Sequence, residues 1–172
     1  MNILNQIKKS KKKHKQLVLD LANKIKKDKK LFSQLVNAFE AGSDVEKGTC
    51  AEVMKYVTVE KPEYALSHIG TIIKYINYDA PRVKWGCPET IGNIAKKFPD
   101  KVEKAIPNLF INTKDKSTVV RWCAAYALTE IAKYNSKKQK ELISKFKIII
   151  EKEQNNGVKN VYLKTLKILD KQ

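Results

Sequence analysis

The fold of this chain is indicated by two similar stretches, "VKWGCPETIGNIAKKFP" (residues 83–99) and "VRWCAAYALTEIAKYNS" (residues 120–136). Each begins with Val, a basic residue and Trp, and each carries Ile-Ala-Lys near its other end. The two stretches are 37 residues apart, a spacing typical of proteins built from repeated helical hairpins. The sequence therefore predicts a repeat protein.

Further positions follow the same shift of 37 residues. The aligned sets are Lys47, Lys84 and Arg121; Cys50, Cys87 and Ala124; Met54, Ile91 and Leu128; and Val57, Ile94 and Ile131. With a shift of 38 the register continues into the last segment, through Lys159, Tyr162, Leu166 and Leu169. Within each copy the apolar residues recur at i, i+4 and i+7, which is the spacing of one helix face, and no segment alternates as a strand would. The pattern predicts an all-α fold.

A second helix is expected after each of these helices, at residues 62–77, 99–113 and 137–153. The first two begin with a proline, Pro62 and Pro99, which a helix tolerates at its first position. A single hairpin exposes an apolar face that only a neighbouring hairpin can cover, so the copies should stack into one solenoid domain. The expected units are a basic capping hairpin at residues 1–27 and repeats at residues 28–60, 61–98, 99–135 and 136–172.

The segment "TKDKSTVVRWCAAYALTEIAKY" (residues 113–134) closely resembles the HEAT repeat, with its Asp, its Val-Arg and its Ala-rich helix ending Leu-x-x-Ile-Ala. The resemblance covers roughly residues 28–172. It implies a right-handed α-α superhelix of about four and a half helical hairpins, in which the helices that open with Val-Arg line the concave face. It also implies that Asp115 and Arg121 form hydrogen bonds between neighbouring turns.

The positive charge is concentrated at the amino terminus. The 172 residues carry a net charge of +17, and residues 1–30 hold eleven Lys against two acidic residues. Such asymmetry predicts an anionic partner, such as nucleic acid, an acidic protein tail or a phospholipid surface. The alternative is compositional bias, because the chain has 33 Lys and only two Arg. The expected basic patch consists of Lys8, Lys9, Lys11, Lys12, Lys13 and Lys15.

The two tryptophans are the strongest candidates for partner contacts. Trp122 lies two residues before Ala124, about 200° round the helix, and therefore points away from the core. Trp85 is its equivalent, and we expect both indoles to be partly exposed and adjacent. They either form a platform for bases or a peptide in a Lys-lined groove, or fill the gap between neighbouring helices. The expected binding residues are Trp85, Trp122, Tyr126, Lys96, Lys133, Lys164 and Lys167.

Evidence for catalysis is limited to Glu89, which could act as a general base or simply form an ion pair with Lys55 or Lys96. A weaker resemblance, to HEAT-like alkylpurine DNA glycosylases, rests on Trp85, on Glu89 one turn later and on Arg121 in the next repeat. It implies DNA in the concave face and catalytic roles for Glu89 and Arg121. That family has Asp where this chain has Glu.

Other classes of function find little support in the composition. The three cysteines form no CxxC pair and come with two histidines, so we expect buried thiols and neither a metal nor another cofactor. The apolar runs are too short to cross a bilayer, and the amino terminus lacks the apolar block of a secretory signal. We expect a cytoplasmic, non-enzymatic binding or scaffold module that uses its concave face. The alternative is a DNA-binding protein of alkylation repair.

Overall fold

A computed structural model describes residues 2–171, and within them every regular element is a helix and no strand forms. The all-α prediction is confirmed. In chain order the elements are α1 (Ile3–Lys9), α2 (His14–Ile25), α3 (Lys30–Ala41), α4 (Asp44–Glu60), the 3-10 helix η1 (Pro62–His68), α5 (Ile69–Lys74), α6 (Pro81–Ala95), the 3-10 helices η2 (Pro99–Lys101) and η3 (Glu103–Ala105), α7 (Ile106–Asn112), α8 (Thr118–Tyr134), α9 (Ser136–Lys152) and α10 (Asn156–Leu169).

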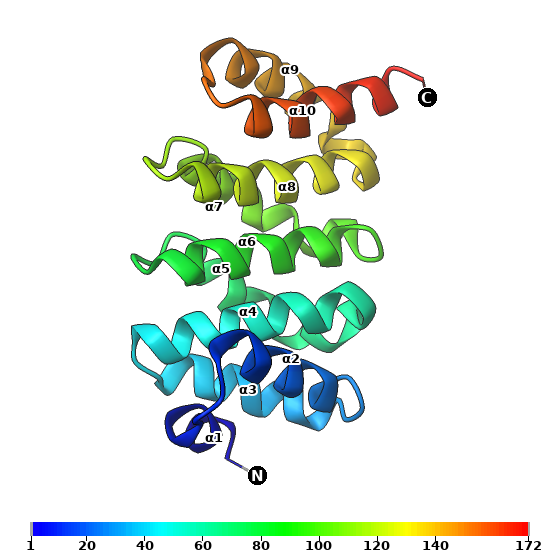
Figure 1. Cartoon of the computed structure of the whole chain (residues 1–172). Helices are drawn as coiled ribbons and strands as arrows, with labels where there is room; N and C mark the ends of the chain where they lie inside the picture. The colour runs from blue at the N-terminus through cyan, green and yellow to red at the C-terminus, as the bar shows by residue number, and fades with distance from the viewer. Residues whose placement is uncertain (1, 172) are drawn as a thin grey trace.

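The helices form a stack with the two chain ends at opposite ends of it (Figure 1). One row consists of α2, α4, α6, α8 and α10, in which each helix packs on the next. Helices α3, α5, α7 and α9 form the other row and pack against the partners that follow them in the chain. The arrangement is a helical repeat solenoid, as the 37-residue period predicts.

The repeated core positions are equivalent in the structure. Cys50, Cys87 and Ala124 are completely buried at the interfaces of the first row. Helices α4 and α6 approach closely because α6 has a glycine at the contact: a Cβ on Gly86 would lie 2.6 Å from the backbone carbon and oxygen of Ala51. Such a distance is a clash, so α4 and α6 can pack this closely only because residue 86 has no side chain.

The helices begin at side chains that satisfy their free N–H groups. Ser43 and Glu46 form a capping box at the start of α4. The side chains of Ser117, Asn135 and Asn155 accept hydrogen bonds from the first turns of α8, α9 and α10. Residues of this type at a helix start stabilise it by about 1 kcal/mol relative to Ala.

The second helices predicted at residues 62–77 and 99–113 begin at Pro62 and Pro99 as expected, but neither is α-helical throughout. Each begins instead with 3-10 turns, η1 in the first case and η2 with η3 in the second, before a short α-helix. Pro107 explains the second interruption, because it has no N–H and its ring clashes with the carbonyl four residues earlier. In the first case the interruption falls at His68, with φ −117° and ψ 4°. The third, α9, is uninterrupted.

Ion pairs connect successive hairpins on the side where the first-row helices begin. Lys84 Nζ lies 3.0 Å from the Asp115 carboxylate. Arg121 Nε and Nη2 donate to the Glu153 carboxylate at 2.8 and 3.1 Å. Arg121 also donates to the backbone oxygen of Asp115, at 3.0 Å. The bonds between turns implied by the HEAT resemblance therefore exist, but the carboxylate that Arg121 binds belongs to Glu153 rather than to Asp115.

Candidate functional site

The exposed side of α6 and α8 carries the aromatic residues predicted to bind a partner. We call the surface made by Arg82, Trp85, Glu89, Trp122 and Tyr126 the inner surface. Trp122 is 39% exposed, and its indole stacks on the Tyr126 ring with a centroid distance of 5.9 Å and an interplanar angle of 4°. Two flat rings held in parallel on one helix form a rigid platform with one face open to a partner.

Hydrogen bonds across three helices hold Tyr126 in place. Its hydroxyl donates to Asn93 Oδ1 at 2.6 Å, and Asn93 Nδ2 donates to the backbone oxygen of Lys55 at 3.0 Å. Gly92 gives the ring its space, since a Cβ there would lie 2.6 Å from Tyr126 Cε1. The platform is therefore positioned by α4 and α6 as well as by its own helix.

Trp85 lies at a small cavity between α4, α6 and the start of α8. The cavity has a volume of about 210 Å³ and is lined by Glu52, Lys55, Arg82, Trp85, Gly86, Glu89 and Val119. The Trp85 side chain is half-buried, and its Nε1 is buried with no hydrogen-bond partner among residues 2–171. An unpaired buried donor costs about 1 to 3 kcal/mol, so an acceptor that reached this N–H would gain a strong hydrogen bond.

Both indoles are partly exposed, as predicted, and each has different surroundings. The ring that Trp122 contacts is Tyr126, and none of the ring contacts of the described residues joins Trp85 to Trp122. Trp85 belongs to the cavity and Trp122 to the exposed stack. Trp85 is the more buried of the two tryptophans, and their adjacency stays a prediction.

The two carboxylates of the cavity are both paired. Lys55 Nζ lies 3.8 Å from Glu89, and the Cys123 thiol donates to the same carboxylate at 3.4 Å. Burial raises the pKa of the Glu89 carboxyl, and the nearby Lys55 ammonium offsets this only in part. Glu52 lies 2.7 Å from His14 Nε2 on α2. The predicted ion pair between Glu89 and Lys55 is confirmed.

The predicted lysines differ in their surroundings. Lys133 is paired with Glu130. Lys96, Lys164 and Lys167 are exposed and form no ion pair with any other described residue. The six lysines of the basic patch are exposed as well, and of these Lys12 is paired with Asp20. Unpaired positive charge is therefore exposed at the end of α6, on α10 and near the amino terminus.

The residues of the glycosylase resemblance are engaged in other contacts. Arg121 binds Glu153 and the Asp115 backbone, whereas Glu89 is paired with Lys55 and Cys123.

In the part of the chain described, no group of three or more His, Cys, Asp and Glu residues could hold a metal ion. Over the same residues, none of the helices combines the length and the apolar character that a membrane crossing requires.

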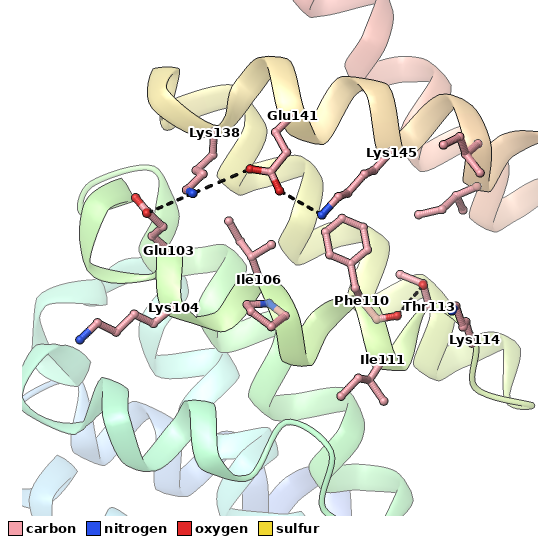
Figure 2. A pocket seen from close by; sticks show the side chains of 13 residues that line it. Glu103, Lys104, Ile106, Phe110, Ile111, Thr113, Lys114, Lys138, Glu141 and Lys145 are labelled. Carbon is pink, nitrogen blue, oxygen red and sulfur yellow. Dashed lines mark hydrogen bonds and ion pairs between the residues drawn. The ribbon is translucent and has the colours of Figure 1, made fainter.

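A larger groove, which the sequence analysis missed, lies in the second row. It occupies about 860 Å³ between α7 and α9 (Figure 2). Two of its apolar residues, Ile111 and Ile148, are 61% and 53% exposed. In the sequence they cannot be distinguished from core residues, because their surroundings depend on how two separate helices pack. No signal in the repeat pattern marks them.

Comparisons with known proteins support the fold class. No protein-family model matches the chain, and no curated protein matches it. Among solved structures, the chain is similar to a designed armadillo repeat protein in complex with the peptide (KR)4, with 17% identity over 96% of this chain and 79% of that one, at a TM-score of 0.70. The fold is therefore an armadillo-like helical repeat solenoid.

Proposed function

We propose that this protein is a binding module whose inner surface holds an extended, acidic segment of a partner protein. The observation that carries the proposal is the Trp122–Tyr126 stack, in which Trp122 is 39% exposed on α8. Exposed aromatic residues on a preformed surface provide contact area at little cost in conformational entropy, and Trp and Tyr are common among the residues that dominate binding.

The repeat fold favours a protein partner, and the charge of this chain favours an acidic one. The structurally similar designed protein binds the basic peptide (KR)4. In this chain the carboxylates of the cavity, Glu52 and Glu89, are already paired, whereas Lys96, Lys164 and Lys167 lie exposed. A net charge of +17 attracts an acidic segment and repels a basic one.

The cavity at Trp85 would receive one group of the bound segment. The indole Nε1 is an unused donor, and Arg82, which lies 2.6 Å from His14 Nε2, supplies a positive charge at the same cavity. A carbonyl or carboxylate oxygen of the partner would accept a hydrogen bond from Trp85 Nε1 and interact with the positive charge of Arg82. The platform at Trp122 then contacts the apolar surface of the next residues, so the two sites together would fix the position of the segment.

The proposal is tested with two peptides of equal length and opposite charge, (Asp-Glu)4 and (Lys-Arg)4. We expect calorimetry at low salt to show saturable binding of the acidic peptide and none of the basic one. Trp122→Ala should weaken that binding by about tenfold. Ile148→Ala is the control, since Ile148 is 53% exposed but lies on α9, in the other row of helices. Equal losses in the two variants would contradict the proposal.

A second candidate function is the weak, sequence-independent binding of nucleic acid at the basic patch. The specific observation is that five of its lysines, Lys8, Lys9, Lys11, Lys13 and Lys15, are exposed without an ion pair to another described residue. Retention on duplex DNA at low salt should disappear steeply as salt rises and should be lost when these lysines are replaced by Gln. Retention unaffected by that replacement would exclude the patch as the binding site.

A further inference from the structure

The groove between α7 and α9 is open to solvent and is lined by both apolar and charged side chains (Figure 2). Its volume of about 860 Å³ falls within the usual range of ligand sites, about 300 to 1,000 Å³. The apolar residues that line it are Ile106, Pro107, Phe110, Ile111, Ile148 and Ile149. The groove belongs to the other row of helices and shares no residue with the inner surface, so it requires an occupant of its own.

Two large aliphatic side chains of the groove lining are exposed to solvent. Ile111 is 61% and Ile148 53% exposed, and the two stand on opposite walls, one on α7 and the other on α9. Burying a large aliphatic side chain is worth about 1.5 to 3 kcal/mol. An apolar partner that filled the groove would therefore gain a substantial free energy from these two residues alone.

The rim of the groove carries four lysines and two glutamates, Glu103 and Glu141, and is therefore positive on balance. Glu103 lies 3.5 Å from Lys138. Lys104 and Lys114 lie toward the two ends of α7, and Lys138 and Lys145 come from α9. Glu141 bridges the last two, at 3.8 Å from Lys138 and 2.9 Å from Lys145 (Figure 2). Lys104 and Lys114 have no ion pair with any residue that the structure describes, and their charges are left for a partner.

One lysine also covers the aromatic part of the lining. Lys145 Nζ lies 4.6 Å from the centroid of the Phe110 ring, in the range of a cation–π contact. The contact of Lys145 with Glu141 is exposed to solvent, since both side chains are exposed. The groove can thus accept an acidic partner without breaking a buried ion pair.

The geometry points to this groove as the docking site of an acidic amphipathic helix from a partner protein. Apolar residues at i, i+3, i+4 and i+7 of that helix would fill the space between Ile111 and Ile148. Acidic residues on its flanks would face Lys104 and Lys114. The charge complementarity selects this occupant over a second copy of the chain, because two copies would bring like-charged lysine rims together.

The probe for this site is a fluorescent peptide of about 15 residues, near the length at which isolated helices become stable. It consists of Leu, Ala and Glu, with the leucines at helical spacing. Two control peptides have Lys in place of Glu, or the same composition with the leucines scrambled. We expect saturable anisotropy changes with the acidic helix only. Equal binding of the Lys peptide, or no saturation of the acidic one up to about 100 μM, would overturn the proposal.

Point variants locate the binding. Ile111→Glu and Ile148→Glu should each weaken it by about tenfold, and both should fold because the side chains are more than half exposed. Val59→Glu is the matched control, since Val59 is 66% exposed on α4. Replacement of Lys104 and Lys114 by Glu should weaken binding, whereas the same change at Lys11 and Lys13 should not. Groove variants that bind like the wild type would overturn the proposal.

Two further measurements separate this site from the other possibilities. Trp122→Ala should leave binding of the helical peptide to the groove unchanged. This variant therefore distinguishes a failure of the proposed binding at the inner surface from a failure of the proposed binding in the groove. Sedimentation tests the second copy: a dimer that Ile111→Glu dissociates, in the absence of probe binding, would assign the groove to self-association and contradict the acidic helix.

Discussion

Arg121 on α8 donates through Nε and Nη2 to both carboxylate oxygens of Glu153, which lies between α9 and α10, at 2.8 and 3.1 Å. Glu153 is nearly buried and also accepts from the backbone N–H of Asn155 at 2.8 Å. The pair joins one hairpin to the next near the carboxyl end of the stack. A bidentate contact of this kind fixes orientation as well as distance.

Replacement of Glu153 by Gln should therefore destabilise the protein. Loss of a hydrogen-bonded charge costs about 1.5 to 3 kcal/mol, measured as the free energy of unfolding in urea. Glu141→Gln is the control, because Glu141 pairs with Lys145 at the surface and such pairs contribute less than about 1 kcal/mol. Equal effects of the two substitutions would show that the Arg121 contact does not stabilise the stack.

The same ion pairs predict loss of stability in acid. Burial alone would raise the pKa values of the Glu153 and Asp115 carboxyl groups, but hydrogen bonds from Arg121 and Asn155 to Glu153, and from Ser117 and Lys84 to Asp115, hold them below their ordinary values of 4.5 and 3.8. These groups stabilise the fold above those values and lose that contribution as the pH falls through the lowered pKa. Unfolding free energies should drop below about pH 4.5, and less steeply in Glu153→Gln.

Glu89 should behave in the opposite way. Burial raises its pKa above 4.5, so ionisation of this carboxyl in the folded protein lowers stability as the pH rises through 4.5 toward the raised value. Glu89→Gln is expected to leave the free energy of unfolding at neutral pH unchanged or higher. A large destabilisation would mean that the pair with Lys55 outweighs the cost of burial.

Glu89 also provides the test of the enzyme alternative. A glycosylase-like activity would release alkylated purines from DNA and would lose that release in Glu89→Gln. Since Arg121 is bound to Glu153 and Glu89 to Lys55, we expect no release by the unmutated protein. The measurement is chromatography of free bases after incubation with alkylated DNA.

Two glycines allow a matched test of the packing in the first row. Gly86→Ala would place a Cβ 2.6 Å from the Ala51 backbone, which should force α6 away from α4 and cost about 1 to 3 kcal/mol. Gly70→Ala, in α5, meets nothing within 4 Å and should stabilise by about 0.5 to 1 kcal/mol. The melting temperatures of both variants test this prediction. Similar changes in the two variants would contradict the close approach of α6 to α4.

The repeat pattern predicts those features that depend on spacing along one helix. The buried set Cys50, Cys87 and Ala124 and the pair of Glu89 with Lys55 follow from residues one period apart or on adjacent helices of the same row. Interruptions of the second helices depend on local backbone preferences at Pro107 and His68, which a hydrophobic period does not record.

The Arg121–Glu153 pair and the groove could not be predicted from the sequence, for a different reason. Glu153 lies at the end of α9, in a copy of the repeat where the alignment shifts from 37 to 38 residues, and no motif links it to Arg121. The groove at Ile111 and Ile148 is likewise a product of how α7 and α9 diverge. Both require knowledge of packing that one sequence does not carry.

The two tryptophans should differ in what their removal does. Trp85 is half-buried at the cavity between α4 and α6, so Trp85→Ala should lower stability, toward the roughly 3 to 5 kcal/mol typical of buried aromatic residues. Trp122→Ala should change the melting temperature less, because one face of its indole is exposed. Calorimetric unfolding of both variants tests this prediction. A larger loss of stability in Trp122→Ala than in Trp85→Ala would show that the role of Trp122 is structural.

The central claim is that Trp122 contacts an acidic segment of a partner, and its own fluorescence tests this most directly. The chain has two tryptophans, so Trp85→Phe leaves Trp122 as the single reporter, although it also removes the Nε1 donor of the cavity and should weaken binding. Titration of this variant with (Asp-Glu)4 should give a saturable change in emission that high salt reverses, and (Lys-Arg)4 should give none. An emission that stays constant while calorimetry detects binding of the acidic peptide, or an equal response to the basic peptide, would contradict the account.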